Sequence, residues 1–229
     1  MIILLFDIDG TLILTGGAGM RGMNRAFVEL FNVENALDGL TLSGMTDKII
    51  FRDACKKANI EFSERNHANF KQSYIEYLKK EIEKPAHGKQ ILPGVQDLLE
   101  KLRFESEIRL GLLTGNYAPC AKIKLQHFGL DQYFEFGAYG DDNEDRNKLV
   151  PYALTRYSDR IGQNGKITST WIIGDTPKDV RCARPHHAKA IAVATGGYSE
   201  EELAKAEPDA TFTDLTDSRQ FLDIIKKVS

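Results

Sequence analysis

Cysteine is scarce in this sequence. The 229 residues contain only Cys55, Cys120 and Cys182, with no C-x-x-C pair among them. Three widely spaced cysteines favour reduced thiols over a disulfide framework or a zinc site. No apolar run approaches the ~20 residues of a membrane span, and the six residues before Asp7 lack the basic start of a signal peptide. We therefore expect a cytoplasmic protein that does not bind membranes.

An excess of basic residues is also absent. The formal net charge is −3 and the isoelectric point is near 6.0, so we expect no nucleic-acid partner. The glycine-rich run TGGAG (15–19) lacks the GK[ST] ending of a nucleotide-binding loop, which argues against a kinase. The chain does have 42% hydrophobic residues, enough to fill the core of one large domain or of a domain with an insert.

Short apolar segments alternate with amphipathic segments from about residue 91 onward. Strands are expected at 2–6, 108–114, 133–139, 170–174, 189–195 and 210–214, and helices at 95–104, 118–128, 148–161, 178–187, 199–206 and 217–227. This alternation predicts an α/β fold, in which helices cover both faces of a Rossmann-like parallel sheet.

Residues 16–87 interrupt the alternation. Apolar residues at helical spacing predict three helices and no strand there, at 20–31, 47–59 and 66–84. We therefore predict an all-helical cap domain over 16–87, inserted into an α/β catalytic core made of 1–15 and 88–229. The TGGAG run would be the flexible exit from the core into this cap.

Two aspartates follow the first strand in the stretch FDIDGT. Residues two apart in an extended chain point to the same face, so the carboxylates of Asp7 and Asp9 can converge. A bound cation would stabilise both in the ionised form. One carboxylate can then attack phosphorus, while the other protonates the leaving oxygen and later activates water. The alternative is an ordinary strand end closed by a polar turn.

Two further strand ends carry suitable partners. In LLTGN, the hydroxyl of Thr114 and the backbone around Gly115 and Asn116 can bind phosphate oxygens, although an ordinary turn would look the same. In GDTPKD, Asp175 can complete an oxygen-rich Mg²⁺ site. Asp179 is either another ligand or an acid favoured by a helix N-terminus.

A cation is expected at the start of the helix at 148–161. An ammonium at Lys148 would neutralise both the nucleophile and the phosphate, and Arg146 is the less favoured alternative. Acids, a hydroxyl and a cation at four ends of one sheet together describe a metal-assisted phosphoryl-transfer site.

With these motifs, the chain resembles the haloacid dehalogenase-like hydrolase superfamily over essentially its whole length, and within it phosphatases of the phosphoglycolate phosphatase type. The resemblance implies that Asp7 is the nucleophile and a Mg²⁺ ligand. It implies that Asp9 is the general acid and base and contributes its backbone carbonyl to the metal. Thr114 would bind phosphate, helped by Gly115 and Asn116.

The resemblance also implies that Asp175 is a metal ligand and that Asp179 is a ligand or an anchor behind the ligands. The third motif departs from the family pattern, because Leu149 stands where the family often has proline after the lysine. In the expected cap, TLSGMTDKII (41–50) resembles the segment through which capped relatives lean over the substrate. Thr46 is predicted there as a substrate contact, with a helix N-cap as the alternative.

The expected activity is Mg²⁺-dependent hydrolysis of a small phosphomonoester through an aspartyl-phosphate, and phosphoglycolate fits this description. The alternatives are a phosphomutase on the same scaffold and a catalytically idle binding protein. The expected partner is a small phosphorylated metabolite. We expect a monomer, with a dimer through the cap as the alternative.

Overall fold

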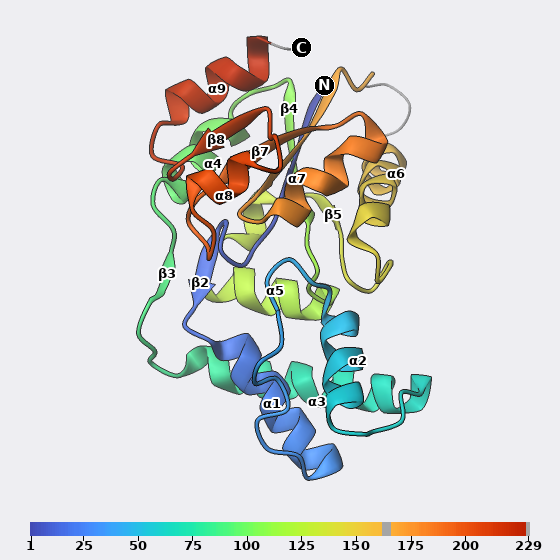
Figure 1. Cartoon of the computed structure of the whole chain (residues 1–229). Coiled ribbons are helices and arrows are strands. Elements are labelled where there is room, and N and C mark those ends of the chain that lie inside the picture. The colour runs from blue at the N-terminus through green and yellow to red at the C-terminus, as the bar shows by residue number, and fades with distance from the viewer. Residues whose placement is uncertain (162–165, 228–229) are drawn as a thin grey trace.

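A six-stranded parallel sheet forms the centre of the computed structural model, which describes residues 1–161 and 166–227 (Figure 1). The strand order is β5-β4-β1-β6-β7-β8. The strands are β1 (Ile2–Phe6), β4 (Ile108–Leu113), β5 (Phe136–Ala138), β6 (Ser169–Gly174), β7 (Lys189–Val193) and β8 (Ala210–Phe212). Because β1 pairs with β4 on one side and β6 on the other, its carboxyl end lies where the strand order reverses.

Helices cover both faces of this sheet, which confirms the predicted Rossmann-like α/β fold. They are α4 (Val95–Arg103), α5 (Ala118–His127), α6 (Leu149–Ile161), α7 (Pro177–Ala183), α8 (Glu200–Ala204) and α9 (Ser218–Lys227). Leu4 and Phe6 of β1 belong to the apolar cluster formed with α4, α5 and α9. Leu5 points to the other face and packs with α6, α7 and α8. Both faces of β1 are thus buried, which explains its unbroken apolar sequence.

A second, two-stranded sheet was not predicted. Strands β2 (Ile13–Thr15) and β3 (Lys89–Ile91) pair antiparallel, with Leu14 opposite Gln90. Three residues are too few to show a periodic pattern in the sequence. The two strands bracket the helical segment, because the chain leaves the main sheet through β2 and returns through β3.

The segment between β2 and β3 contains α1 (Ala18–Phe31), α2 (Asp47–Lys57) and α3 (Glu64–Glu83). In Figure 1 these helices lie at the end of the molecule opposite the two termini. They share an apolar cluster of their own, in which the rings of Phe51 and Phe70 stack with centroids 4.4 Å apart. Tyr117 and Cys120, near the start of α5, belong to the same cluster and join it to the sheet layer. The division into a cap at 16–87 and a core stays our prediction.

The glycine-rich run forms a tight turn before α1. Gly16 and Gly17 both have left-handed backbones, with φ of 59° and 80°. A Cβ on Gly16 would lie 2.7 Å from the Cβ of Ala86 on the returning chain, so both backbone conformation and space favour glycine there.

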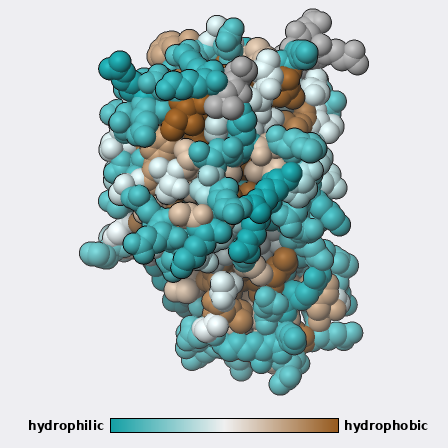
Figure 2. All heavy atoms as spheres, turned by 45° about the horizontal axis from the view of Figure 1, so that its top comes forward, coloured by the Kyte–Doolittle hydropathy of each residue, from teal (hydrophilic) through white to brown (hydrophobic). Residues whose placement is uncertain are grey.

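The apolar side chains of the chain lie mostly inside these layers. On the face drawn in Figure 2, hydrophilic residues cover most of the surface and hydrophobic residues form small separate patches. Within 1–161 and 166–227, no helix combines the length and apolar composition needed to cross a membrane.

Candidate active site

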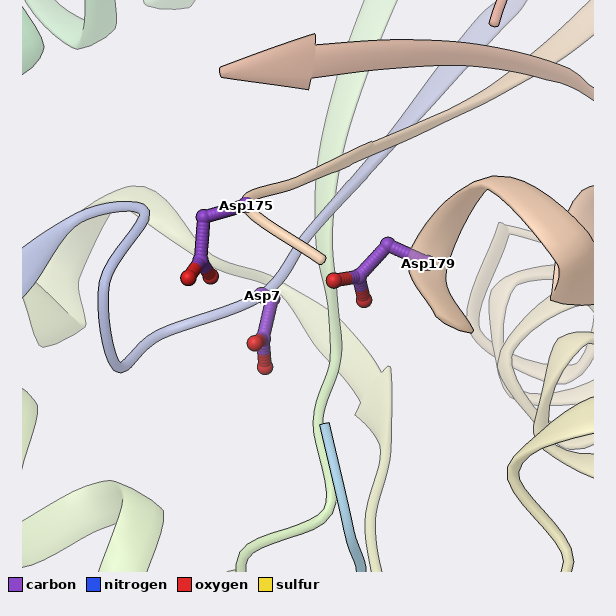
Figure 3. Close-up of side chains that lie close together, drawn as sticks. All are labelled: Asp7, Asp175 and Asp179. Carbon is purple, nitrogen blue, oxygen red and sulfur yellow. The ribbon is translucent and has the colours of Figure 1, made fainter. Parts of the chain in front are cut away.

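A cavity of about 430 Å³ lies at the carboxyl ends of β1, β4 and β6, and residues of the helical segment form its opposite wall. Three buried aspartates meet there: Asp7 directly after β1, Asp175 directly after β6, and Asp179 in α7. Figure 3 shows these three side chains close together, coming from different segments of the chain. One oxygen from each lies within 4.8 Å of the others.

Local hydrogen bonds hold Asp179 in place. Its Oδ2 accepts from the backbone N–H and the Oγ1 of Thr176, at 3.0 and 2.6 Å, and this capping box starts α7. A Cβ at position 174 would lie 2.1 Å from Cγ of Asp179, so Gly174 permits this close approach. Asp179 therefore caps α7 and also belongs to the acidic cluster, and its role as a metal ligand stays a prediction.

The carboxylate of Asp175 is also held by neighbouring segments of the chain. Its Oδ1 accepts a 3.0 Å hydrogen bond from Oγ1 of Thr11. A Cβ on Gly10 would lie 2.4 Å, and one on Gly196 1.8 Å, from its Oδ2. Two segments therefore approach this carboxylate so closely that only glycine fits at either position.

Burial shapes the electrostatics of the cluster. Burial, together with the neighbouring carboxylates of Asp179 and Asp7, raises the pKa of Asp175 to about 8. Burial also raises the pKa of Asp7 to about 6, although the guanidinium of Arg146 opposes the shift. A divalent cation would remove this repulsion, and buried carboxylate oxygens are the ligands that Mg²⁺ prefers. The residues present therefore fit a site for a divalent metal ion.

Arg146, not Lys148, is the cation beside these aspartates, which corrects our expectation. Its Nη2 lies 3.2 Å from Oδ1 of Asp7 and also pairs with Asp179. Arg146 and Lys148 share one short 3₁₀ turn, and Leu149 and Val150 after it are buried against the sheet. That packing turns Arg146 into the cavity wall and leaves Lys148 exposed.

This correction predicts very different effects for two neighbouring substitutions. We expect Arg146→Ala to lower kcat about 10²- to 10³-fold, since it removes the charge that faces Asp7 and an entering anion. Lys148→Ala should change kcat less than about twofold, because its ammonium lies in solvent. Steady-state rates with p-nitrophenyl phosphate measure both.

Circular dichroism must accompany these rates, because Arg146→Ala leaves two buried carboxylates without their partner. Arg146→Lys retains a charge and separates loss of folding from loss of the guanidinium. A larger loss of activity in Lys148→Ala than in Arg146→Ala would contradict the assignment.

Asp9 lies on the other side of the cavity in a hydrogen-bond network. Its Oδ2 accepts from Nζ of Lys124 at 2.6 Å and from Nδ2 of Asn116 at 2.8 Å. Lys124 also donates to Oδ1 of Asn116 at 2.6 Å, and Nδ2 of Asn116 donates to Oγ1 of Thr114 at 2.8 Å. The DxD and TGN motifs are thus connected directly, and both line the cavity, as does Gly115.

Sequence reasoning missed Lys124. It is buried on α5 among Cys120, Ala121 and Leu125. A lysine on the apolar face of a helix that follows the TGN motif was the available signal, since a buried lysine needs a partner.

Asp47, the first residue of α2, was not among the predicted site residues. Its backbone N–H donates to the carbonyl of Gly115 at 2.8 Å, and its Oδ2 accepts from the backbone N–H of Tyr117 at 2.7 Å. These bonds fasten α2 to the TGN loop. Burial raises the pKa of Asp47 to about 7, although the nearby ammonium of Lys124 lowers it.

Thr46 does not line the cavity, so the structure does not support its expected contact with substrate. It occupies the N-cap position of α2, and its Oγ1 donates to the carbonyl of Glu144 at 3.0 Å. Its neighbours Met45 and Asp47 line the cavity instead. The predicted segment therefore borders the cavity, but not through the side chain of Thr46.

A parallel α/β sheet with buried aspartates at its strand ends is the arrangement of the hydrolase superfamily that the motifs resemble. The family model described as haloacid dehalogenase-like hydrolase matches residues 4–193. The chain therefore belongs to the haloacid dehalogenase-like hydrolases.

Similar proteins extend over nearly the whole chain. A phosphoglycolate phosphatase of Aquifex aeolicus is 24% identical over 97% of this chain and 97% of its own length. The pyrophosphatase PpaX of Halalkalibacterium halodurans is 24% identical over 96% of this chain and 95% of its own. A crystal structure described as a predicted phosphoglycolate phosphatase from Haemophilus somnus matches with a TM-score of 0.70, at 20% identity, over 96% of this chain and 97% of that one.

Proposed function

We propose that this protein is a Mg²⁺-dependent phosphatase that hydrolyses a small phosphomonoester through an aspartyl-phosphate on Asp7. The observation that carries the proposal is the position of the Asp7 carboxylate. It lines the cavity beside the other two buried aspartates and 3.2 Å from Nη2 of Arg146, and Asp9 lines the same cavity. Relatives named phosphatase support the same reaction class.

The side chains of Asp7 and Asp175 and the backbone carbonyl of Asp9 would hold the Mg²⁺, with Asp179 as a further ligand or as an anchor behind them. When bound, the ion supplies positive charge that offsets these carboxylates and the phosphate oxygens.

The chain's own residues account for the remaining chemistry. A carboxylate oxygen of Asp7 attacks phosphorus, and the bond to the leaving oxygen breaks as Asp9 gives that oxygen a proton. Asp9 then takes a proton from water, whose oxygen attacks the phosphorus and releases Asp7 and inorganic phosphate. Arg146 balances charge on the transferring group, and Thr114 with the backbone at Gly115 and Asn116 holds its oxygens. Lys124 and Asn116 orient the Asp9 carboxylate through their hydrogen bonds.

We also propose that residues 16–87 act as a cap over the core. The helical segment supplies one wall of the cavity, and its two connections are the paired strands β2 and β3. Closure of this wall would exclude bulk water from the first step and select the leaving group.

Phosphate release with and without metal tests the proposed reaction. With Mg²⁺, the protein should release phosphate from p-nitrophenyl phosphate, and EDTA should lower the rate at least about 100-fold, since the buried carboxylates then lack their counter-charge. Added Mg²⁺ should restore it. Conversion of a sugar phosphate to an isomer without phosphate release would favour a phosphomutase. No turnover with a broad set of phosphate esters would favour a binding protein.

A further inference from the structure

One buried hydroxyl of the cavity wall has no hydrogen-bond partner among the residues that the structure describes. It belongs to Tyr74 of α3, whose side chain is completely buried and lines the cavity. A buried hydroxyl without a partner costs roughly 1–3 kcal/mol, so such a group is uncommon unless a ligand satisfies it.

The ammonium of Lys124 lies beside this hydroxyl. A Cβ on Gly19 would lie 3.4 Å from the Tyr74 hydroxyl oxygen and 3.6 Å from Nζ of Lys124, so both atoms border the same small space. Gly19 itself lines the cavity and leaves that space open. Lys124 has three N–H donors, of which two bind Asp9 and Asn116. One donor therefore remains for a ligand next to the Tyr74 hydroxyl.

A large part of this wall is apolar. It is formed by Leu14, Met20, Met23, Leu42, Met45 and Ile50. These side chains suit the carbon skeleton of a leaving alcohol, whereas the Tyr74 and Lys124 groups suit a polar substituent on it.

The charges of the cavity disfavour a second anionic group on the substrate. Four aspartates line it, including Asp47 on the helical side, against two basic side chains in the described part of the wall. Both basic side chains already contact aspartates: Arg146 contacts Asp7, and Lys124 contacts Asp9. A leaving group with a carboxylate would find both cations already paired with aspartates and would also face Asp47, which is about half ionised near pH 7.

Given the proposed phosphatase reaction, on which this inference rests, we propose that the substrate is the phosphate ester of an uncharged alcohol bearing a second hydroxyl group. Tyr74 and Lys124 bind that hydroxyl. Phosphoglycolate and inorganic pyrophosphate, whose leaving groups carry negative charge, are selected against.

Two matched pairs of esters test the charge preference. 2-Hydroxyethyl phosphate and phosphoglycolate differ only in a CH₂OH group against a carboxylate, as do glycerol 3-phosphate and 3-phosphoglycerate. With Mg²⁺, kcat/KM should be at least about tenfold higher for the ester without the carboxylate in at least one pair. In neither pair should the ester with the carboxylate have the higher kcat/KM. Equal or higher kcat/KM for the carboxylates would overturn the inference while leaving the phosphatase intact.

Substitution of Tyr74 tests the binding group. Tyr74→Phe removes only the hydroxyl and keeps the ring that stacks on Phe70. The measured quantity is kcat/KM for the preferred hydroxylated ester divided by kcat/KM for p-nitrophenyl phosphate, which lacks a second hydroxyl. This ratio should fall about five- to tenfold in the variant, mainly because KM for the hydroxylated ester rises. Gly19→Ala, which places a methyl group against the same two polar atoms, should lower the ratio similarly.

Tyr157→Phe is the matched control. Tyr157 is also a buried tyrosine whose hydroxyl has no partner in the described structure, but it lies on α6 and does not line the cavity. This substitution should leave the ratio unchanged. A ratio unaffected by Tyr74→Phe would overturn the role of Tyr74. If the wild-type protein released phosphate from no ester at all, the proposed function would fail first and this inference with it.

Discussion

Asp7→Asn is expected to abolish phosphate release, lowering kcat on the order of 10⁴-fold or more. An amide cannot displace the leaving oxygen to form the covalent ester, and no other carboxylate of the cluster occupies the same place. Asp175 lies at the end of another strand, held by Thr11, and Asp179 is held by the start of α7. The loss should therefore appear in kcat at saturating substrate and Mg²⁺, with p-nitrophenyl phosphate as the reporter.

This variant should fold normally, because asparagine keeps the size of the side chain and Arg146 retains Asp179 as a partner. Above about pH 6 the substitution also removes a buried charge whose ionisation burial disfavours. Asp159→Asn, an exposed change on α6, is the control and should retain wild-type kcat. Mass spectrometry of acid-quenched protein should detect a phosphorylated form of the wild type and none of Asp7→Asn. Full Mg²⁺-dependent activity in Asp7→Asn would mean that another group attacks phosphorus.

The second large effect concerns stability in the absence of metal. Burial raises the pKa of Asp175 to about 8 and that of Asp7 to about 6, from 3.8 in the unfolded chain. At a pH between 3.8 and about 8, the folded protein binds more protons than the unfolded chain, so the free energy of unfolding falls as pH rises through this range. Each unit of pKa difference corresponds to about 1.4 kcal/mol. We therefore expect the melting temperature of the metal-free protein to fall by several degrees between pH 6 and pH 8.

Mg²⁺ should reverse this loss, since it binds the ionised carboxylates and offsets their repulsion. The rise in melting temperature on adding Mg²⁺ should thus be larger at pH 8 than at pH 6. Asp175→Asn provides the comparison, because it removes the group with the higher pKa. Its metal-free form should lose less stability between pH 6 and pH 8, and Mg²⁺ should stabilise it less. Equal stabilisation of both proteins by Mg²⁺ would place the ion elsewhere.

Local sequence was sufficient to predict the sheet and the acidic cluster. The six main strands are short, mostly apolar segments, and the central ones are buried on both faces, so their composition identifies them without knowledge of their partners. Asp7 and Asp175 directly follow such strands, and parallel strands place their carboxyl ends at one edge. Sequence alone therefore predicted that these carboxylates come together, and it predicted the three helices of the segment 16–87.

Tertiary packing decided the remaining features. The orientation of a single 3₁₀ turn decides whether Arg146 or Lys148 enters the site, and the burial of Leu149 and Val150 at the start of α6 fixes that orientation. The sequence shows two nearby basic residues but not which of them faces the site. The ammonium of Lys124 became part of the site because α5 turns that face toward Asp9. Tyr74 lines the cavity because α3 packs against α1 and α5, although Tyr74 is 65 residues from Asp9 and 40 residues from Thr114 along the chain. Short-range periodicity determines which faces are buried, but only long-range contacts determine which polar side chains share one cavity.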